Sequence, residues 1–339
     1  MGKNIAIWLG VEVEKLKDVF TTQDLDLINE ILCVKEPSLS EQILRKFLQP
    51  ILSILNSESR YKFTNLIKKL KGVKGAKLKD VNKWELVIFL QRLKQKLSIN
   101  GMTWNGKKAS LCLTHDVDYL EDFQNIDYII DMEQRFGLKS SFNFLTSWDY
   151  KIEKQILKRL LDNGFEIGLH GHTHDVAFGY RSKEQITTMI KKARDELGVE
   201  VAGFRTPTLA ISRKVLEVLE VLKFKYDTSI LGSNVEICFP YQYPGLNIWE
   251  LPLTLQDNFL FRDQNLTQDE GFEFTRQMIE DIIKIGGLVV LNLHPQICKI
   301  NSIFYEKLVN FISQLKDVWK TTPIQVIEYL EGDFMKVFG

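Results

Sequence analysis

The sequence predicts an α/β fold in its C-terminal two-thirds, preceded by a helical N-terminal region. From about residue 106 onward, short apolar runs alternate with segments of helical periodicity, as in parallel strands covered by helices. Residues 1–105 show only helical spacing of their apolar residues. Asn-Gly pairs at 100–101 and 105–106 mark a turn-rich boundary. We therefore expect two regions, 1–105 and 106–339, and periodicity alone leaves the sheet open or closed into a barrel.

The N-terminal region is predicted to hold several helices. Apolar residues recur at helical spacing over 25–32 and again over 84–97. Between these segments, Ser38 and Glu41 form a capping-box signature for a helix that Pro50 should end or kink. No motif in this region carries recognisable chemistry.

A run of lysines follows this helix, at Lys68, Lys69, Lys71, Lys74, Lys77 and Lys79. A solvated turn is the simpler interpretation. The alternative is a binding patch for an anionic glycan, a nucleotide or a lipid headgroup. No aromatic residues are interleaved with the lysines, which argues against a groove for single-stranded nucleic acid.

The C-terminal region is predicted to alternate strands and helices along the chain. Short apolar runs predict strands over 109–113, 141–145, 165–169, 201–204, 224–226 and 288–293. Helical periodicity predicts helices over 126–136, 152–161, 183–197, 212–222, 270–285 and 303–315. Ser182 and Gln185 form a capping box, and Gly137 is placed to end the first of these helices.

Composition and charge exclude some classes of protein. The 339 residues are 45% hydrophobic and 26% charged, which is ordinary for a globular protein. Lys+Arg and Asp+Glu both number 44, so no global field favours nucleic acid or a membrane. No segment approaches the roughly 20 apolar residues that span a bilayer. The four cysteines form no C-x-x-C pair, and the N-terminus becomes charged too early for a signal peptide. If Met1 is the natural start, we expect a cytoplasmic protein.

All five histidines directly follow predicted strands: His115, His170, His172, His174 and His294. In α/β sheets and barrels, residues at the carboxyl ends of strands point into the active site. Histidines scattered over a surface would not gather at these positions. The sequence therefore predicts an active site at this edge of the sheet.

Two motifs are suited to a cation. In Thr-His-Asp-Val-Asp, Asp116 and Asp118 can divide the work, one binding a cation and the other handling a proton. Taken alone, this segment could equally be a polar loop or a helix cap. His170 and His174 are four residues apart, so on one helical turn both rings would face a metal such as zinc. His172 would point elsewhere and is predicted to be structural or to support the metal ligands from outside.

Two further residues are candidates by position. Arg205, at a strand end, can hold a carboxylate bidentately and keep it ionised. His294 follows an apolar strand in Leu-Asn-Leu-His, where a general acid and a satisfied core histidine are both open.

Together, in this order, Thr-His-Asp-Val-Asp, Gly-Phe-Glu-Ile-Gly-Leu-His-Gly-His-Thr-His, Phe-Arg-Thr-Pro and Leu-Asn-Leu-His resemble the polysaccharide deacetylase family. The shared region of that family is called the NodB homology domain. The resemblance covers roughly residues 107–330 and leaves the N-terminal third unmatched. It implies a distorted (β/α) barrel of about seven strands.

The resemblance also implies roles for individual residues. Asp116 matches the catalytic base, His294 the general acid, and Arg205 the residue that orients Asp116. The metal ligands it implies are Asp118, His170 and His174, and the substrate-binding residues are Leu293, which would line the acyl-methyl pocket, and Pro207.

Three departures from the family pattern stand out. Val117 separates two aspartates that are commonly adjacent, so the metal is assigned to Asp118, as in the D-x-D variants. Gly171 replaces a Ser or Thr. The fourth family motif is not clear, and Asp227 is our candidate for this catalytic position, with Glu250 as a second choice.

The implied activity is a metal-dependent hydrolase that removes an N-acyl group, acetyl first, from a sugar or glycan precursor. One divalent metal is expected, Zn²⁺ first, with Co²⁺, Fe²⁺, Ni²⁺ and Mn²⁺ as alternatives. Two rivals remain: a cyclic amide hydrolase of the allantoinase or imidase type, and a non-catalytic glycan-binding protein. Nucleic acid is not expected as a partner.

Overall fold

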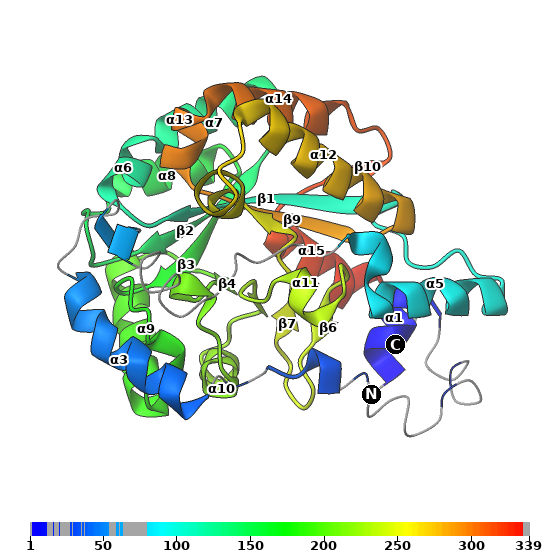
Figure 1. Cartoon of the computed structure of the whole chain (residues 1–339), viewed down its shortest axis with the longest axis horizontal. Helices are drawn as coiled ribbons and strands as arrows, with labels where there is room; N and C mark the ends of the chain where they lie inside the picture. The colour runs from blue at the N-terminus through cyan, green and yellow to red at the C-terminus, as the bar shows by residue number, and fades with distance from the viewer. Residues whose placement is uncertain are drawn as a thin grey trace.

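The computed structural model describes residues 2–11, 16, 20, 28, 30–34, 36, 38–53, 59–60, 62–63 and 80–334. The lysine run at 68–79 lies outside these described residues, and so does half of the segment 25–32. A curled sheet lies at the centre of the molecule, with helices packed around it (Figure 1). The architecture is the distorted (β/α) barrel with an N-terminal helical region that the sequence predicts.

The sheet contains ten strands in the described part of the chain, in the order β6-β7-β5-β4-β3-β2-β1-β9-β8, with β10 also pairing with β1. Every pairing is parallel except β6 with β7. The sequence predicted about seven strands. Five of the ten are only two residues long, which is too short to be recognised from a sequence pattern. The strands are β1 Ala109–Val117, β2 Ser140–Leu145, β3 Glu166–Gly171, β4 Gly203–Phe204, β5 Tyr226–Asp227, β6 Tyr241–Gln242, β7 Trp249–Glu250, β8 Leu255–Gln256, β9 Leu288–Leu293 and β10 Val318–Lys320.

Strand β1 is the centre of the sheet and has three neighbours. It pairs with β9 along one side, and with β10 and then β2 along the other. All nine of its residues are buried, as expected for a parallel strand covered on both faces. This pairing carries β1 four residues beyond its predicted end, so His115 and Asp116 lie within the strand rather than after it.

Helices surround the sheet and follow the predicted segments closely. They are α6 Leu120–Gln124, α7 Ile126–Arg135, α8 Lys154–Asp162, η3 Phe178–Tyr180, α9 Lys183–Leu197, η4 Pro207–Leu209, α10 Arg213–Val221, α11 Gly232–Val235, η5 Phe259–Asp263, α12 Gln268–Ile285, α13 Pro295–Ile300, α14 Ser302–Gln314, α15 Pro323–Tyr329 and η6 Leu330–Phe334. Ser182 and Gln185 form the predicted capping box of α9. Thr267 and Glu270 form another, which starts α12 two residues earlier than expected.

The described N-terminal helices pack on two sides of the barrel (Figure 1). They are α1 Gly2–Leu9, α3 Leu39–Ser53, η2 Val81–Lys83 and α5 Glu85–Leu97. Trp8 Nε1 donates to Pro240 O at 2.7 Å, and both Trp8 and Trp84 belong to the same buried core as the strands. Helix α3 does not end at Pro50 but continues through it to Ser53. No helix in the described ranges is long and apolar enough to cross a membrane.

Candidate metal and acid–base site

Three predicted ligands meet at the carboxyl ends of β1 and β3. Ligand atoms of Asp118, His170 and His174 all lie within 4.8 Å of one another, and all three residues are buried. His170 Nε2 lies 3.1 Å from Asp118 Oδ1, and His174 Nε2 lies 3.4 Å from Asp118 Oδ2. The fold therefore brings one carboxylate and two imidazoles to a single point.

The two histidines do not converge by the predicted helical turn. His170 belongs to β3, and His174 lies in the loop that follows the strand. Gly171 has φ +124°, a conformation that side-chain-bearing residues rarely adopt, and Asp175 N then donates to Thr173 O at 2.8 Å. This turn brings the ring centroids of His170 and His174 to 5.9 Å. The helical geometry was wrong, whereas the convergence of the two rings was right.

The cluster has the donor set that a divalent metal needs. His170 Nδ1 lies 2.8 Å from the Arg205 carbonyl oxygen, which can only accept, so Nδ1 donates and Nε2 is the ring nitrogen that faces Asp118. Asp118 Oδ1 is buried and accepts no hydrogen bond among the described residues. Burial alone would raise the pKa of Asp118, but His174 and His170 outweigh it and hold that pKa well below its usual range. An ionised carboxylate with one oxygen that accepts no hydrogen bond, next to two imidazoles, is a suitable ligand set for zinc or a similar cation.

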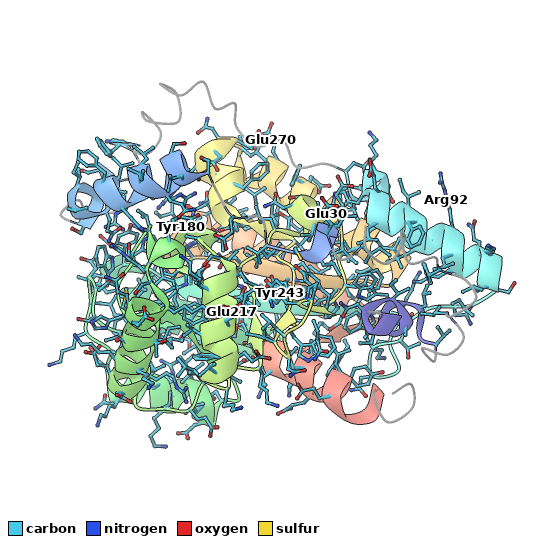
Figure 2. The ribbon with its side chains drawn as sticks, turned by 90° about the horizontal axis from the view of Figure 1, so that it is seen from below. Glu30, Arg92, Tyr180, Glu217, Tyr243 and Glu270 are labelled. Carbon is cyan, nitrogen blue, oxygen red and sulfur yellow. The ribbon has the colours of Figure 1, made fainter. Side chains whose placement is uncertain are left out.

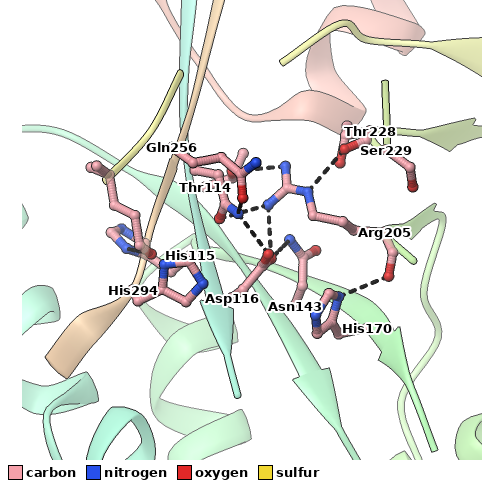
Figure 3. A network of polar contacts seen from close by, with 12 residues as sticks. Thr114, His115, Asp116, Asn143, His170, Arg205, Thr228, Ser229, Gln256 and His294 are labelled. Carbon is pink, nitrogen blue, oxygen red and sulfur yellow. Dashed lines mark hydrogen bonds and ion pairs between the residues drawn. The ribbon is translucent and has the colours of Figure 1, made fainter. Parts of the chain in front are cut away.

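Asp116 lies next to this cluster in a shell of donors (Figure 3). Arg205 Nη1 and Asn143 Nδ2 donate to Asp116 Oδ1 at 2.8 and 2.9 Å, and Asn292 Nδ2 donates to Oδ2 at 2.7 Å. Burial opposes ionisation, yet Arg205 and the nearby histidines lower the pKa of Asp116 to about 2. Asp116 is therefore a carboxylate at neutral pH, and Arg205 contacts it as expected.

The two asparagines were missed from sequence. Asn143 is paired in register with Asp116, and Asn292 with Thr114, so both face the same side of the sheet as Asp116. Asn292 is the single polar residue of the apolar strand β9, and Asn143 lies between two phenylalanines in β2, and these positions are the signal that could have identified them.

His294 is held by a carboxylate that the sequence did not suggest. Its Nδ1 donates to Asp257 Oδ1 at 2.6 Å, its backbone N–H donates to Asp257 Oδ2, and its Nε2 lies 3.6 Å from Asp118 Oδ2. Burial would lower the pKa of His294, but Asp257 and Asp118 raise it well above its ordinary value. Asp257 follows β8, a two-residue strand too short to leave a pattern in the sequence.

Asp227, our candidate for the fourth family motif, bonds to other groups than His294. Its carboxylate accepts from Ser229 N and Oγ, and it is paired in register with Glu250. Burial raises the pKa of Asp227 to about 6 and that of Glu250 well above its usual range. This pair touches the site only indirectly, because Ser229 Oγ accepts from Thr206 N, next to Arg205.

The two predicted substrate-binding residues lie in different surroundings. Pro207 begins η4 and lies beside Gly171, where a side chain at position 171 would meet its ring at 3.5 Å. Leu293 is paired in register with His115, whose ring points away from Asp116 toward Glu133. Because alternate residues of a strand face opposite sides, Asn292 rather than Leu293 faces Asp116.

Two of the five histidines serve the structure instead of the site. His115 Nε2 lies 2.9 Å from Glu133 Oε1, which also accepts from Tyr305 at 2.8 Å, in a fully buried network. His172 Nδ1 lies 3.0 Å from Glu196 at the half-exposed surface, in the structural role expected for it. Only His170, His174 and His294 gather around Asp118.

One site residue comes from the N-terminal region, where the sequence had suggested no chemistry. Arg60 is 5% exposed, and its Nη1 lies 3.1 Å from His174 Nδ1. Its guanidinium carbon lies 4.6 Å from the centre of the Trp148 ring and 5.7 Å from that of Tyr119. Arginine can only donate, so His174 Nδ1 accepts in this arrangement. No spacing or motif near residue 60 pointed to this contact.

The chain is similar to known proteins over part of its length. Residues 104–226 match the family model described as polysaccharide deacetylase. The peptidoglycan deacetylase-like protein FGM2 of Gibberella zeae is 31% identical over 147 residues, which make up 42% of this chain and 44% of that protein. The chain thus matches less than half the length of this curated relative.

Solved structures share the fold at low sequence identity. A protein from Mycobacterium smegmatis assigned to the polysaccharide deacetylases has a TM-score of 0.61 at 17% identity, covering 70% of this chain and 94% of that one. One from Pseudomonas aeruginosa PAO1, assigned likewise, has a TM-score of 0.55 at 12% identity, covering 68% and 94%. PuuE allantoinase has a TM-score of 0.55 at 13% identity, covering 68% and 93%.

Proposed function

We propose that the protein is a metal-dependent hydrolase of non-peptide C–N bonds, since residues 104–226 match the polysaccharide deacetylase family model. Its substrate would be an N-acylated, first of all N-acetylated, sugar or glycan precursor. The proposal rests on two groups with oppositely shifted pKa values, a carboxylate and an imidazole. Both lie beside the candidate metal ligands Asp118, His170 and His174. Against the effect of burial, Arg205 lowers the pKa of Asp116 to about 2, and Asp257, whose Oδ1 accepts from His294 Nδ1, raises the pKa of His294 well above its ordinary value. Titratable groups pushed apart in this way mark the base and the acid of a catalytic site.

The residues of the chain then divide the reaction between them. Water adds across the amide, the C–N bond breaks, and the products are a carboxylic acid and an amine. Asp116 takes the proton of the attacking water, while Arg205, Asn143 and Asn292 keep its carboxylate ionised and oriented. His294 gives its proton to the departing nitrogen. Steps of this kind contribute on the order of 10²–10⁴ in rate each.

Asp118, His170 and His174 would hold the metal. When bound, a divalent ion supplies Lewis-acid activation of water and of the acyl carbonyl. Zinc is our first expectation, because the donor set is one carboxylate and two imidazoles. The cytoplasmic location expected from the sequence stays a prediction.

A cyclic amide hydrolase is the second candidate, and the fold shared with an allantoinase favours it. The same acid, base and metal ligands could open a ring amide. A glycan-binding protein without activity is disfavoured, because binding alone gives no use to an ionised base paired with a protonated acid.

The test is a parallel assay of the zinc-loaded protein on two substrate sets. Acetate release from N-acetylated sugars and oligosaccharides, without ring opening of allantoin or cyclic imides, supports the deacetylase. The opposite result supports the second candidate. Asp116→Asn should retain the metal and lose most turnover, whereas full activity in metal-free His170→Ala would rule out both enzymatic schemes.

A further inference from the structure

The proposed acid, the proposed base and the three candidate metal ligands are recessed in the protein. These five residues are between 2% and 8% exposed: Asp116, Asp118, His170, His174 and His294. Sites for small molecules enclose most of their ligand, whereas an interior unit of a polymer needs a cleft through which both of its neighbours can leave. Burial of the five residues therefore favours a substrate that enters the site with one neighbour or none.

Arg60 of the N-terminal region lies where three loops of the barrel meet beside these residues. Tyr119 follows β1, Trp148 follows β2 and His174 follows β3. The rings of Tyr119 and Trp148 have their centres 6.1 and 6.3 Å from that of His174. The guanidinium of Arg60 packs on both aromatic rings and reaches His174 Nδ1, and the arginine is itself only 5% exposed. Arg60 thus fills the space between the three loops.

Helix α3 holds Arg60 against the connection between β3 and α9, which carries His174. Arg60 Nε donates to Leu52 O, near the end of α3, at 3.1 Å. Gln49 Oε1, one turn earlier in the helix, accepts from Val176 N at 2.8 Å. Figure 2 shows α3 along the edge of the molecule, next to Tyr180 of the same connection. The arginine is therefore fixed from both sides, by the helix behind it and by the loops in front of it.

Arg60 and α3 lie outside residues 104–226, the part of the chain that matches the family model. They add a wall to the side of the site that the loops after β1, β2 and β3 form. A guanidinium packed on Trp148 and His174 occupies the volume that a neighbouring sugar would need in order to pass between these loops. A purely structural Arg60 would stabilise the loops and leave the choice of substrate unchanged, so the length of the sugar chain distinguishes the two roles.

We propose that Arg60 and α3 close one side of the site, so that the protein acts on a single N-acylated sugar or on one at the end of a chain, and not on the interior of a polymer. This inference rests on the proposed function, in which the substrate is an N-acylated sugar. Arg60 is then a specificity-determining residue, because it excludes a second neighbouring sugar. It takes no part in the proton transfers assigned to Asp116 and His294.

Binding of a length series tests the wall without turnover. The zinc-loaded Asp116→Asn protein, which should bind substrate without consuming it, is titrated by calorimetry with N-acetylglucosamine and N-acetylgalactosamine oligomers of one to six units. We expect the affinity to stop rising after the second unit, because only one neighbour finds room. When Arg60→Ser is added to this protein, the affinity should continue to rise beyond the second unit, by about threefold or more in total, as further units gain contacts.

Arg45→Ser is the matched control. Arg45 belongs to the same N-terminal region, but its guanidinium lies over Tyr180, 5.6 Å from the ring centre, instead of over a residue of the site. This change should leave the length dependence as it is in the protein with Arg60 intact. Circular dichroism and zinc content confirm that every variant is folded. Mass spectrometry of hexamers treated with the active protein gives a second readout, in which we expect acetyl loss from a terminal unit, and from interior units as well in Arg60→Ser.

Other results overturn the inference. Affinity that rises with every unit up to the sixth while Arg60 is intact, or acetyl loss from interior units in the active protein, shows an open cleft and leaves the proposed function standing. This measurement decides the point even if Arg60→Ser does not fold. The same length dependence with and without Arg60 gives this residue a structural role only. Absence of binding and of hydrolysis for every oligomer contradicts the proposed function itself, and the inference is overturned with it.

Discussion

Arg205 donates to Asp116 at 2.8 Å in an ion pair whose side chains are only 0% and 4% exposed. Arg205 Nη2 also donates to Thr114 and its Nε to Thr228 O, so the guanidinium cannot turn away from the carboxylate. A buried carboxylate without such a partner would take up a proton. The arginine therefore sets the protonation state of the proposed base.

Replacing Arg205 should move the acid limb of the activity profile. In Arg205→Met, the pKa of Asp116 rises from its value of about 2, because burial then acts without the opposing cation. The acid limb of kcat/KM against pH shifts to higher pH, and the free energy of unfolding falls by about 3–5 kcal/mol, as for other broken buried pairs. Urea unfolding and a pH series measure both effects. An unchanged acid limb in a folded Arg205→Met protein contradicts the role given to this pair.

Asp257 and Asp227 allow a matched comparison, because Asp257 bonds to His294 and Asp227, our candidate for the fourth family motif, bonds to Ser229. Asp257→Asn removes the carboxylate that holds the pKa of His294 high, so His294 loses its proton at lower pH. The alkaline limb of the activity profile should shift to lower pH, and kcat should fall by about 10–100-fold. Asp227→Asn should leave that limb in place, because Asp227 bonds to Ser229 and not to His294. The reverse pattern would assign the support of His294 to Asp227 instead of Asp257.

Metal content of the variants should distinguish the proposed metal ligands from Asp116, the proposed base. His170→Ala and His174→Ala each remove one of three donors and should lose stoichiometric zinc, whereas Asp116→Asn should keep it. Because a ligand that binds only the native state stabilises it, added zinc should raise the Tm of the wild-type chain and not that of His170→Ala. Elemental analysis and a thermal scan with and without zinc provide the readouts. Zinc retained at full stoichiometry in both histidine variants would place the metal elsewhere.

Arg60 should weaken metal binding in the resting protein. A guanidinium at 3.1 Å from His174 Nδ1 repels a dication, and it prevents that nitrogen from acting as the donor usual in metal-bound histidines. Arg60→Met should therefore bind zinc about three- to tenfold more tightly, while Arg60→Lys keeps the charge and stays closer to wild type. Competition with a chelator gives the affinities, and Trp148, which lies under the guanidinium, gives a fluorescence signal. Weaker binding in Arg60→Met would show that Arg60 supports the metal site.

Local signals in the sequence determined the elements and the order of the motifs. Apolar runs of five or six residues predicted β2, β3 and β9 almost to the residue, and Ser182 with Gln185 predicted the start of α9, because strand and cap signals act over a few neighbouring residues. Strand signals of the same kind placed Asp116, Asp118, His170 and His294 near the carboxyl ends of β1, β3 and β9, which lie in one sheet with β2 between β3 and β1.

Tertiary structure alone decided the partners of these residues. Asp257 reaches His294 from a strand of two residues, Asn143 and Asn292 reach Asp116 by strand register, and Arg60 reaches His174 across 114 positions. Gly171, through its backbone angle, brings His174 back toward His170 where a helical turn had been expected. Contacts between residues far apart in the chain depend on how the strands pair and how the loops close, and neither leaves a periodic pattern in the sequence. The sequence by itself thus determined which candidate ligands, acid and base are present and at which edge of the sheet they lie. The fold decided which residues orient these groups and shift their pKa values.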